Sequence, residues 1–144
     1  ETIKLIKMEV GYFKVKNPES QDTATKIFKK IVGIVGVDKI EQVVFDNSHK
    51  GGDHIYVFSE NEVIEKLSRL FEQHKILLEF GMKTDEYLTV STFPSIFDDP
   101  DYRDVLDNFL IENLSVDRVL DKVSLSGVGS LNEMDRYILK TKKP

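Results

Sequence analysis

The chain has no cysteine, no hydrophobic run long enough to cross a membrane and none of the short motifs that mark common active sites. Without cysteine, disulfides, thiol catalysis and thiolate metal sites are excluded. A membrane-spanning helix needs about 18 or more consecutive apolar residues, and no stretch here approaches that length. The first residues, ETIKLIKMEV, also lack the apolar core of a secretory signal. We therefore expect a soluble, cytoplasmic protein with no membrane partner.

The catalytic motifs G-x-S-x-G, H-E-x-x-H and G-x-x-x-x-G-K-[ST] do not occur. The serines fall at predicted helix caps or turns, and the three histidines fall in loops or at helix ends. No histidine has a carboxylate partner at helical spacing. The sequence therefore favours a protein that is not an enzyme, and it indicates no cofactor.

A chain of 144 residues is long enough to bury a core as one domain. The net charge of −5 is unevenly distributed, because residues 4–30 carry seven lysines against three acids, whereas residues 97–121 carry eight acids against two arginines. Overall acidity argues against non-specific binding to nucleic acid, which depends on neutralising phosphates. Two oppositely charged surfaces are expected.

The first 60 residues alternate between strand and helix patterns. Residues 3–15 show the period of two that is typical of a half-buried strand, with Gly11 as a candidate bulge or bend. Apolar residues then recur every third or fourth position, which predicts a helix from Ser20 or Asp22 to Gly36. Residues 39–59 read as two strands joined by a glycine-containing turn.

The next segment predicts one helix and two strands. Ser59-Glu60-Asn61-Glu62 matches a capping box, which starts the helix. Strands are predicted over residues 76–80 and 87–90. Residues 1–92 thus read as an α+β domain with a ferredoxin-like βαββαβ core and one extra strand.

Residues 93–144 read as a C-terminal segment of three short helices packed on the same domain. Asp99 is a predicted cap with Pro100 at the first helical position, and Ser115 is a predicted cap of the second helix. Ser130-Leu131-Asn132-Glu133 matches a second capping box and starts the last helix.

Two segments resemble known proteins. VLDKVSLSGVGSLNEMDRYIL, residues 119–139, resembles a short helix-turn-helix at the C-termini of assorted bacterial proteins. That resemblance implies a packing module and a bacterial source. In the order of their elements, residues 59–112 resemble the regulatory part of the C-terminal domain of MutL mismatch-repair proteins. The DQHAxxE endonuclease signature of that family is absent, so the resemblance carries over no catalytic residue.

The loop over residues 46–54 contains the densest cluster of polar side chains. His49, Asp53 and His54 are candidate ligands for a divalent metal, since imidazole and carboxylate suit zinc and its neighbours. Lys50-Gly51-Gly52 is a candidate phosphate cradle, although no helix N-terminus follows it. A plain turn explains the same residues. A small metal- or phosphate-dependent enzyme centred on this loop therefore stays an alternative.

A ferredoxin-like order also invites comparison with RNA-recognition domains, whose third strand carries stacking aromatics. KGGDHIYVF resembles that strand at Lys50, Gly51 and Ile55, and His54 is a loose match at an aromatic position. Gly52 and Val57, however, stand where aromatics belong. Binding of RNA or DNA through the lysine-rich N-terminal third is the first alternative, and it would use Lys4, Lys7, Lys14, Lys26, Lys29 and Lys30.

We expect, first, a non-catalytic protein-interaction or regulatory module that binds a protein partner or a second copy of itself. Three observations motivate this: the missing catalytic constellation, the segregated charge and sheet edges open to pairing. The predicted contact residues lie on two helices: Asp101, Asp104 and Asp107 on the acidic one, and Lys26, Lys29 and Lys30 on the basic one.

Overall fold

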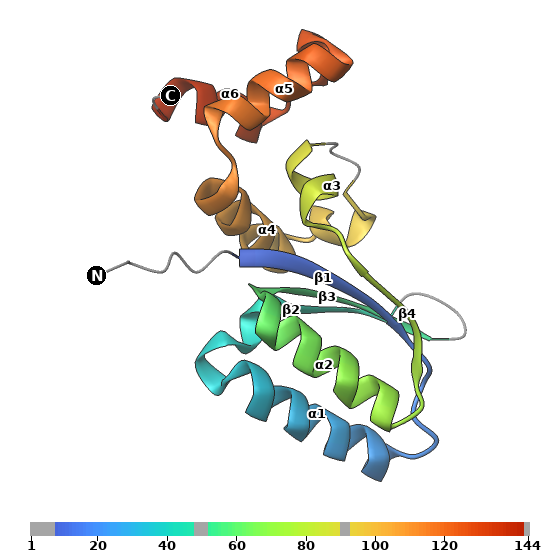
Figure 1. Ribbon diagram of the computed structural model, residues 1–144. Coiled ribbons are helices and arrows are strands. Elements are labelled where there is room, and N and C mark those ends of the chain that lie inside the picture. Colours follow the sequence, from blue (N-terminus) through green and yellow to red (C-terminus); the bar gives the residue numbers. More distant parts are fainter. Residues whose placement is uncertain (1–7, 48–51, 90–92, 143–144) are drawn as a thin grey trace. The chain divides into compact units, whose positions relative to one another are not determined.

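The computed structural model of the chain describes residues 8–47, 52–89 and 93–142 (Figure 1). It is a mixed α+β structure that divides into two compact units, Glu1–Lys83 and Thr84–Pro144. Among the described residues, no helix combines the length and the apolar character that crossing a membrane requires.

The first unit contains one four-stranded antiparallel sheet with the strand order β2-β3-β1-β4. Its strands are β1 (Met8–Val15), β2 (Val43–Asp46), β3 (Asp53–Glu60) and β4 (Leu77–Met82). β1 pairs with β3 on one side, where Tyr12 lies opposite Tyr56, and with β4 on the other. The pairing of β2 with β3 confirms the predicted hairpin.

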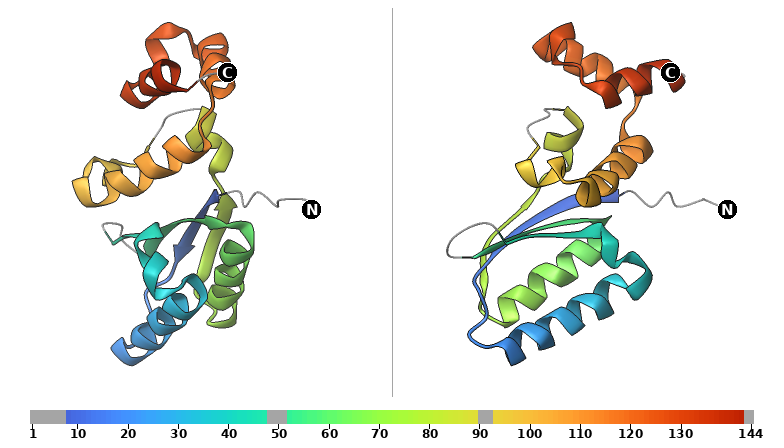
Figure 2. Two further views of the ribbon diagram at one scale, coloured as in Figure 1. Left: turned by 90° about the vertical axis from the view of Figure 1, so that its left-hand side faces the viewer. Right: turned by 180° about the vertical axis from the view of Figure 1, so that it is seen from behind.

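Helices α1 (Gln21–Val35) and α2 (Asn61–Gln73) lie side by side on one face of this sheet (Figures 1 and 2). The Ser20 hydroxyl accepts a hydrogen bond from the Thr23 amide at 3.2 Å and caps α1. Gly36, with φ of 99°, ends the helix. Both predicted limits of α1 are confirmed. They could be predicted because a helix cap and a positive φ depend on only a few neighbouring residues.

The core of this unit fills the space between the sheet and the two helices. Phe13 is fully buried there, edge-on to Phe71 at 5.2 Å between ring centroids and stacked on Phe80 at 5.0 Å. Aliphatic residues from both helices and from β3 surround it, namely Ile27, Ile31, Val35, Ile55, Val57, Ile64, Leu67 and Leu70.

Gly11 does not form the expected bulge. The irregularity of β1 lies between Lys14 and Val15, where the register with β4 shifts. At Gly11 the strand instead approaches α2, and a Cβ added there would lie 2.5 Å from Cγ2 of Ile64. The missing side chain is what lets α2 pack this close to β1.

The capping box predicted at Ser59 is wrong. Ser59 is buried in β3 and lies opposite Glu9 of β1, and Glu60 still pairs with Met8. Helix α2 therefore begins only at Asn61, and Glu60 at its N-cap makes no side-chain capping bond. Strand pairing outcompeted the local capping signal.

In the second unit, the strand predicted over residues 87–90 is also wrong. Residues Thr84–Thr89 form helix α3, and Val90 lies outside the described residues. Acidic Asp85 and Glu86 in its first turn favour a helix N-terminus. Tyr87 and Leu88 are consecutive and both buried, and the Tyr87 ring meets Phe97 edge-on at 6.2 Å. Tertiary packing rather than a period of two therefore buries this pair.

Three longer helices follow a 3-10 helix at Ser95–Asp98: α4 (Pro100–Asn113), α5 (Val116–Ser126) and α6 (Glu133–Thr141). The Asp99 carboxylate accepts from the Asp101 amide at 3.0 Å, and the Ser115 hydroxyl accepts from the Arg118 amide at 3.2 Å. Both predicted caps are confirmed. The helices bury a set of large apolar side chains, namely Leu106, Phe109, Leu110, Leu114, Val119 and Ile138.

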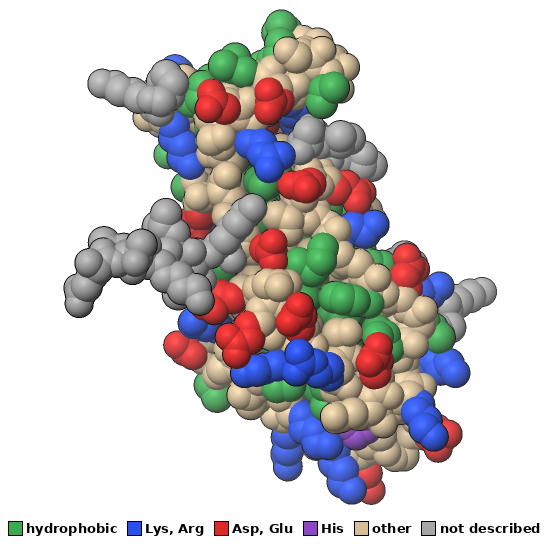
Figure 3. All heavy atoms as spheres, in the orientation of Figure 1, with side chains coloured by type: hydrophobic (Ala, Val, Ile, Leu, Met, Phe, Trp, Pro, Cys, Tyr) green, Lys and Arg blue, Asp and Glu red, His purple; other side chains and the backbone are tan. Residues whose placement is uncertain are grey.

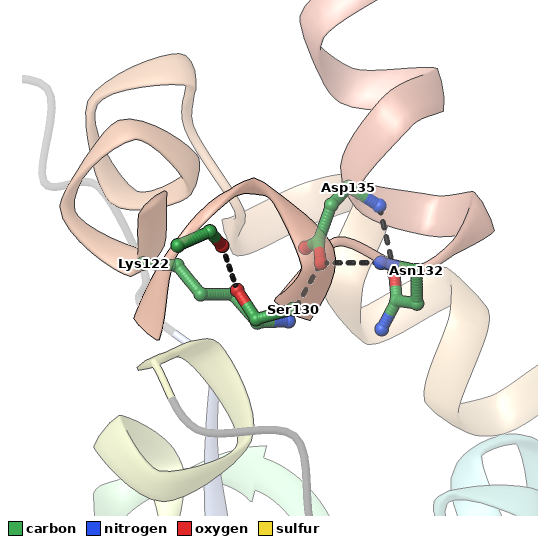
Figure 4. Close-up of polar contacts among 5 residues, drawn as sticks. Lys122, Ser130, Asn132 and Asp135 are labelled. Carbon is green, nitrogen blue, oxygen red and sulfur yellow. Dashed lines mark hydrogen bonds and ion pairs between the residues drawn. The ribbon is translucent and has the colours of Figure 1, made fainter. Parts of the chain in front are cut away.

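The last cap differs from the prediction by two residues. Asn132 and Asp135 form the capping box of α6, whereas the Ser130 hydroxyl donates to the Gly127 carbonyl at 2.6 Å (Figure 4). Gly127, with φ of 80°, turns the chain into a 3-10 helix at Val128–Ser130 before α6. Ser130 is therefore held in that turn.

A buried ion pair joins α5 to α6 (Figure 4). The Lys122 ammonium lies 2.6 Å from Oδ2 of Asp135, with side chains only 5% and 3% exposed. The same Oδ2 accepts the Asn132 amide at 3.0 Å, and Oδ1 of Asn132 accepts the Asp135 amide at 2.9 Å. One carboxylate thus closes the cap of α6 and neutralises the buried lysine.

We predict that Gly11→Ala lowers the free energy of unfolding by about 1–3 kcal/mol, as overpacking of a dense core does. Urea unfolding measures the change. Gly33→Ala is the matched control, because nothing lies within 4 Å of the added Cβ in α1, and helix propensity there favours alanine by about 1 kcal/mol. Equal stability of Gly11→Ala and the wild type would contradict the close contact.

Lys122→Met should lower the free energy of unfolding of the second unit by about 3–5 kcal/mol, since it leaves the buried Asp135 carboxylate without its counter-charge. Adding Asp135→Asn removes that charge but keeps an oxygen for the Asn132 amide, so the double variant should recover most of the loss. Urea unfolding followed by circular dichroism compares them, with exposed Lys140→Met as control. A double variant as unstable as the single one would show that charge imbalance is not the cause.

Candidate functional site

Two of the three predicted metal ligands of the hairpin, Asp53 and His54, lie within the described residues. Asp53 and His54 are consecutive in β3, so their side chains point to opposite faces of the sheet. Asp53 lines a small apolar pocket of about 140 Å³ on the helix side, beside Phe28 and Phe45. His49, Lys50 and Gly51 lie outside the described residues. In the part of the chain that the structure describes, no group of three His, Cys, Asp or Glu side chains is arranged to hold a metal.

His54 instead lies beside a tyrosine that sequence reasoning did not select. Its Nδ1 lies 2.9 Å from the Tyr12 hydroxyl, and the ring centroids are 5.6 Å apart. The Lys83 ammonium stands 5.7 Å from the centroid of the same tyrosine ring. Tyr12 and His54 are 42 positions apart, so only the pairing of β1 with β3 brings them together.

Burial raises the pKa of the Tyr12 phenol above its ordinary value, and the carboxylates of Glu79 and Asp46 raise it further. The phenol therefore stays protonated at neutral pH and is a poor general base. Its hydroxyl lies within hydrogen-bond distance of Nδ1 of His54, and the histidine tautomer decides which of the two groups donates. The Tyr12–His54 contact links β1 to β3. An activated nucleophile has a lowered pKa, whereas the pKa of the Tyr12 phenol is raised.

The predicted basic residues Lys26, Lys29 and Lys30 are all exposed on α1. Only Lys30 lines a groove, which lies between α1 and α2 and has a volume of about 380 Å³. Its other lining residues are Ile34, Lys66, Arg69, Leu70 and Gln73. Lysine and arginine side chains lie among acidic ones on the surface formed by these two helices (Figure 3).

Each cation in this groove has a weak partner. The Lys30 ammonium lies 3.2 Å from Nε2 of His74. Lys66 and Arg69 pair within α2 with Glu62 at 3.3 Å and Glu65 at 3.8 Å, and all four side chains are more than half exposed. Such exposed pairs contribute about 0.3–0.5 kcal/mol each, so a ligand carboxylate can replace them at little cost.

The predicted acidic contact residues lie on α4 without forming a single site. Asp101 and Asp104 are exposed, whereas Asp107 is half-buried and pairs with Arg103 at 3.0 Å. The Asp101 amide donates to Asp99 at the helix cap. Asp99 and Asp107 therefore make contacts within α4 itself. A role of the acidic residues in binding stays a prediction.

No family model, curated protein or solved structure matches the chain.

Tyr12→Phe should lower the free energy of unfolding at neutral pH by about 0.5–1.5 kcal/mol, the usual contribution of one hydrogen bond. The deficit should shrink above about pH 10. There the tyrosine of the unfolded wild type ionises while the folded phenol, with its raised pKa, keeps its proton, so wild-type stability falls with pH. Urea unfolding across this range tests both effects, with exposed Tyr137→Phe as control. A deficit independent of pH would contradict the raised pKa.

Proposed function

We propose that the chain is a non-catalytic protein-interaction module whose α1–α2 groove receives an acidic, amphipathic segment of a partner protein. The observation that carries this proposal is the composition of the groove. Half-buried Ile34 and the edge of the buried Leu70 side chain form the apolar part of its lining, and Lys30, Lys66 and Arg69 provide positive charge around it. A helix with an apolar stripe flanked by carboxylates complements both features.

The combination of apolar and basic residues favours a protein ligand over nucleic acid. Single strands bind to basic grooves that also offer aromatic side chains for stacking, and the lining residues of this groove include no aromatic one among those described. The overall charge of −5 also opposes a sequence-independent attraction to phosphates. Nucleic-acid binding through Lys26, Lys29 and Lys30 stays the second candidate.

The first unit is further proposed to be a ferredoxin-like βαββαβ domain. Its antiparallel order β2-β3-β1-β4 and the two helices on one face support this assignment. In such an arrangement both helices turn one side to the sheet and the other outward. That geometry presents the α1–α2 groove on the surface.

Binding to the groove can be tested with a designed amphipathic helical peptide that carries a leucine stripe flanked by glutamates. We expect the peptide to bind in calorimetry and to shift the amide resonances of α1 and α2. The double variant Lys30→Glu/Arg69→Glu should weaken binding at least tenfold, because it reverses two charges that face the ligand. Lys39→Glu, an exposed lysine outside the groove, should bind like the wild type.

Three ligands separate the hypotheses: the acidic peptide, the same peptide with lysines in place of its glutamates, and a single-stranded oligonucleotide. Preference for the acidic peptide supports the proposal. Equal binding by the lysine peptide, or unchanged affinity in the double variant, would refute it. Tighter binding of the oligonucleotide than of either peptide would instead support nucleic-acid binding at the groove.

A further inference from the structure

Strand β4 is an exposed edge of the sheet. Among the described residues it pairs only with β1, at the end of the order β2-β3-β1-β4. The opposite edge, β2, has four residues that are all buried or half-buried, whereas four of the six residues of β4 are exposed. Long, exposed and apolar edges are templates for pairing with another chain.

The backbone of β4 offers hydrogen-bonding groups on its outer side. The Lys83 amide donates to the Val10 carbonyl at 2.8 Å, so this amide points towards β1. Orientation alternates along an antiparallel strand, and the register is regular from Gly11 opposite Met82 to Lys14 opposite Glu79. The main-chain groups of Phe80 and Met82 therefore point away from β1.

The side chains of β4 expose apolar surface. Leu78, Phe80 and Met82 are 46%, 39% and 42% exposed, and they lie at alternate positions of the strand. Stacking on Phe13 holds the Phe80 ring against the core at 5.0 Å. The edge is therefore ordered before any partner arrives, which lowers the entropic cost of pairing.

We propose that β4 pairs antiparallel with β4 of a second copy of this chain, with Gly81 on the twofold axis. In this register Phe80 of each copy lies opposite Met82 of the other, and their outward amides and carbonyls form the hydrogen bonds. Glu79 of each copy lies opposite Lys83 of the other. Opposite charges across a strand pair are favourable, and directly opposed like charges are not.

Self-complementarity is the reason to choose a second copy as the occupant. Glu79 and Lys83 share one face of the strand, and Cε of Lys83 passes 3.9 Å from the position a Cβ would take on Gly81. Because the two charges stand two residues on either side of Gly81, a twofold axis there pairs them twice. A register centred on Phe80 would instead place Glu79 opposite Gly81.

The pairing involves few residues, so the dimer should be weak and concentration-dependent. Interfaces that bury less than about 1,200 Å² are typical of transient complexes. Sedimentation equilibrium of the full chain over a range of concentrations measures the association. The mass should rise from 16.6 kDa towards twice that value.

Three variants test the register. Met82→Pro removes an outward amide while sparing the bonds to β1, and proline is tolerated at such edge positions, so dimerisation should be lost. Glu79→Lys places like charges opposite each other and should weaken association several-fold, and Glu79→Lys/Lys83→Glu should restore it. The control Val37→Lys changes an exposed apolar residue away from β4 and should dimerise like the wild type. Circular dichroism confirms that each variant is folded.

A wild type that stays monomeric at every concentration would overturn the proposal. A dimer that survives Met82→Pro, or charge swapping that fails to restore association, would overturn it as well. The groove variant Lys30→Glu/Arg69→Glu should leave the dimer intact, which separates this proposal from the proposed function.

Discussion

The close packing of β1 against α2 is the constraint on which the first unit depends. Because Gly11 has no side chain, Ile64 can approach the strand, and two residues further on Phe13 reaches Phe71. β1 is also the strand that pairs with both β3 and β4. A displacement of β1 would therefore disturb the core, the Tyr12–His54 hydrogen bond and the support of Phe80 at the edge.

Charge is treated differently in the two units. In the first, the cations of α1 and α2 stay exposed, where they cost little desolvation and remain available to a ligand. In the second, Lys122 is buried and needs Asp135 beside it. Desolvation makes such a pair a poor source of net stability, but losing one partner is costly. The pair links α5 to α6.

The two proposed surfaces of the first unit use different parts of the same fold. The groove uses the outward sides of two helices, and the β4 pairing uses the main chain at the sheet edge. No residue that lines the groove belongs to the proposed β4 pairing. A module of this kind can hold a partner on its helices while it pairs with a second copy through its sheet.

Much of the local structure was readable from the sequence. The limits of α1, the β2–β3 hairpin and the caps Asp99 and Ser115 depend on a few neighbouring residues, so spacing and capping chemistry identified them. Of the predicted site residues, the lysines of α1 and the acids of α4 were placed on helices, but their grouping was not foreseeable. A groove needs residues from α1 and α2, which lie more than 30 positions apart.

Tertiary structure decided what local signals left open or indicated wrongly. Ser59 lies in β3, where it is opposite Glu9 of β1, and Tyr87 lies in helix α3 with its ring packed against Phe97. The Tyr12–His54 contact and the exposed edge at β4 follow from strand order, which no local pattern encodes. The sequence by itself determined which segments form most helices and strands, since those depend on near neighbours. Only packing between distant segments determined which side chains meet.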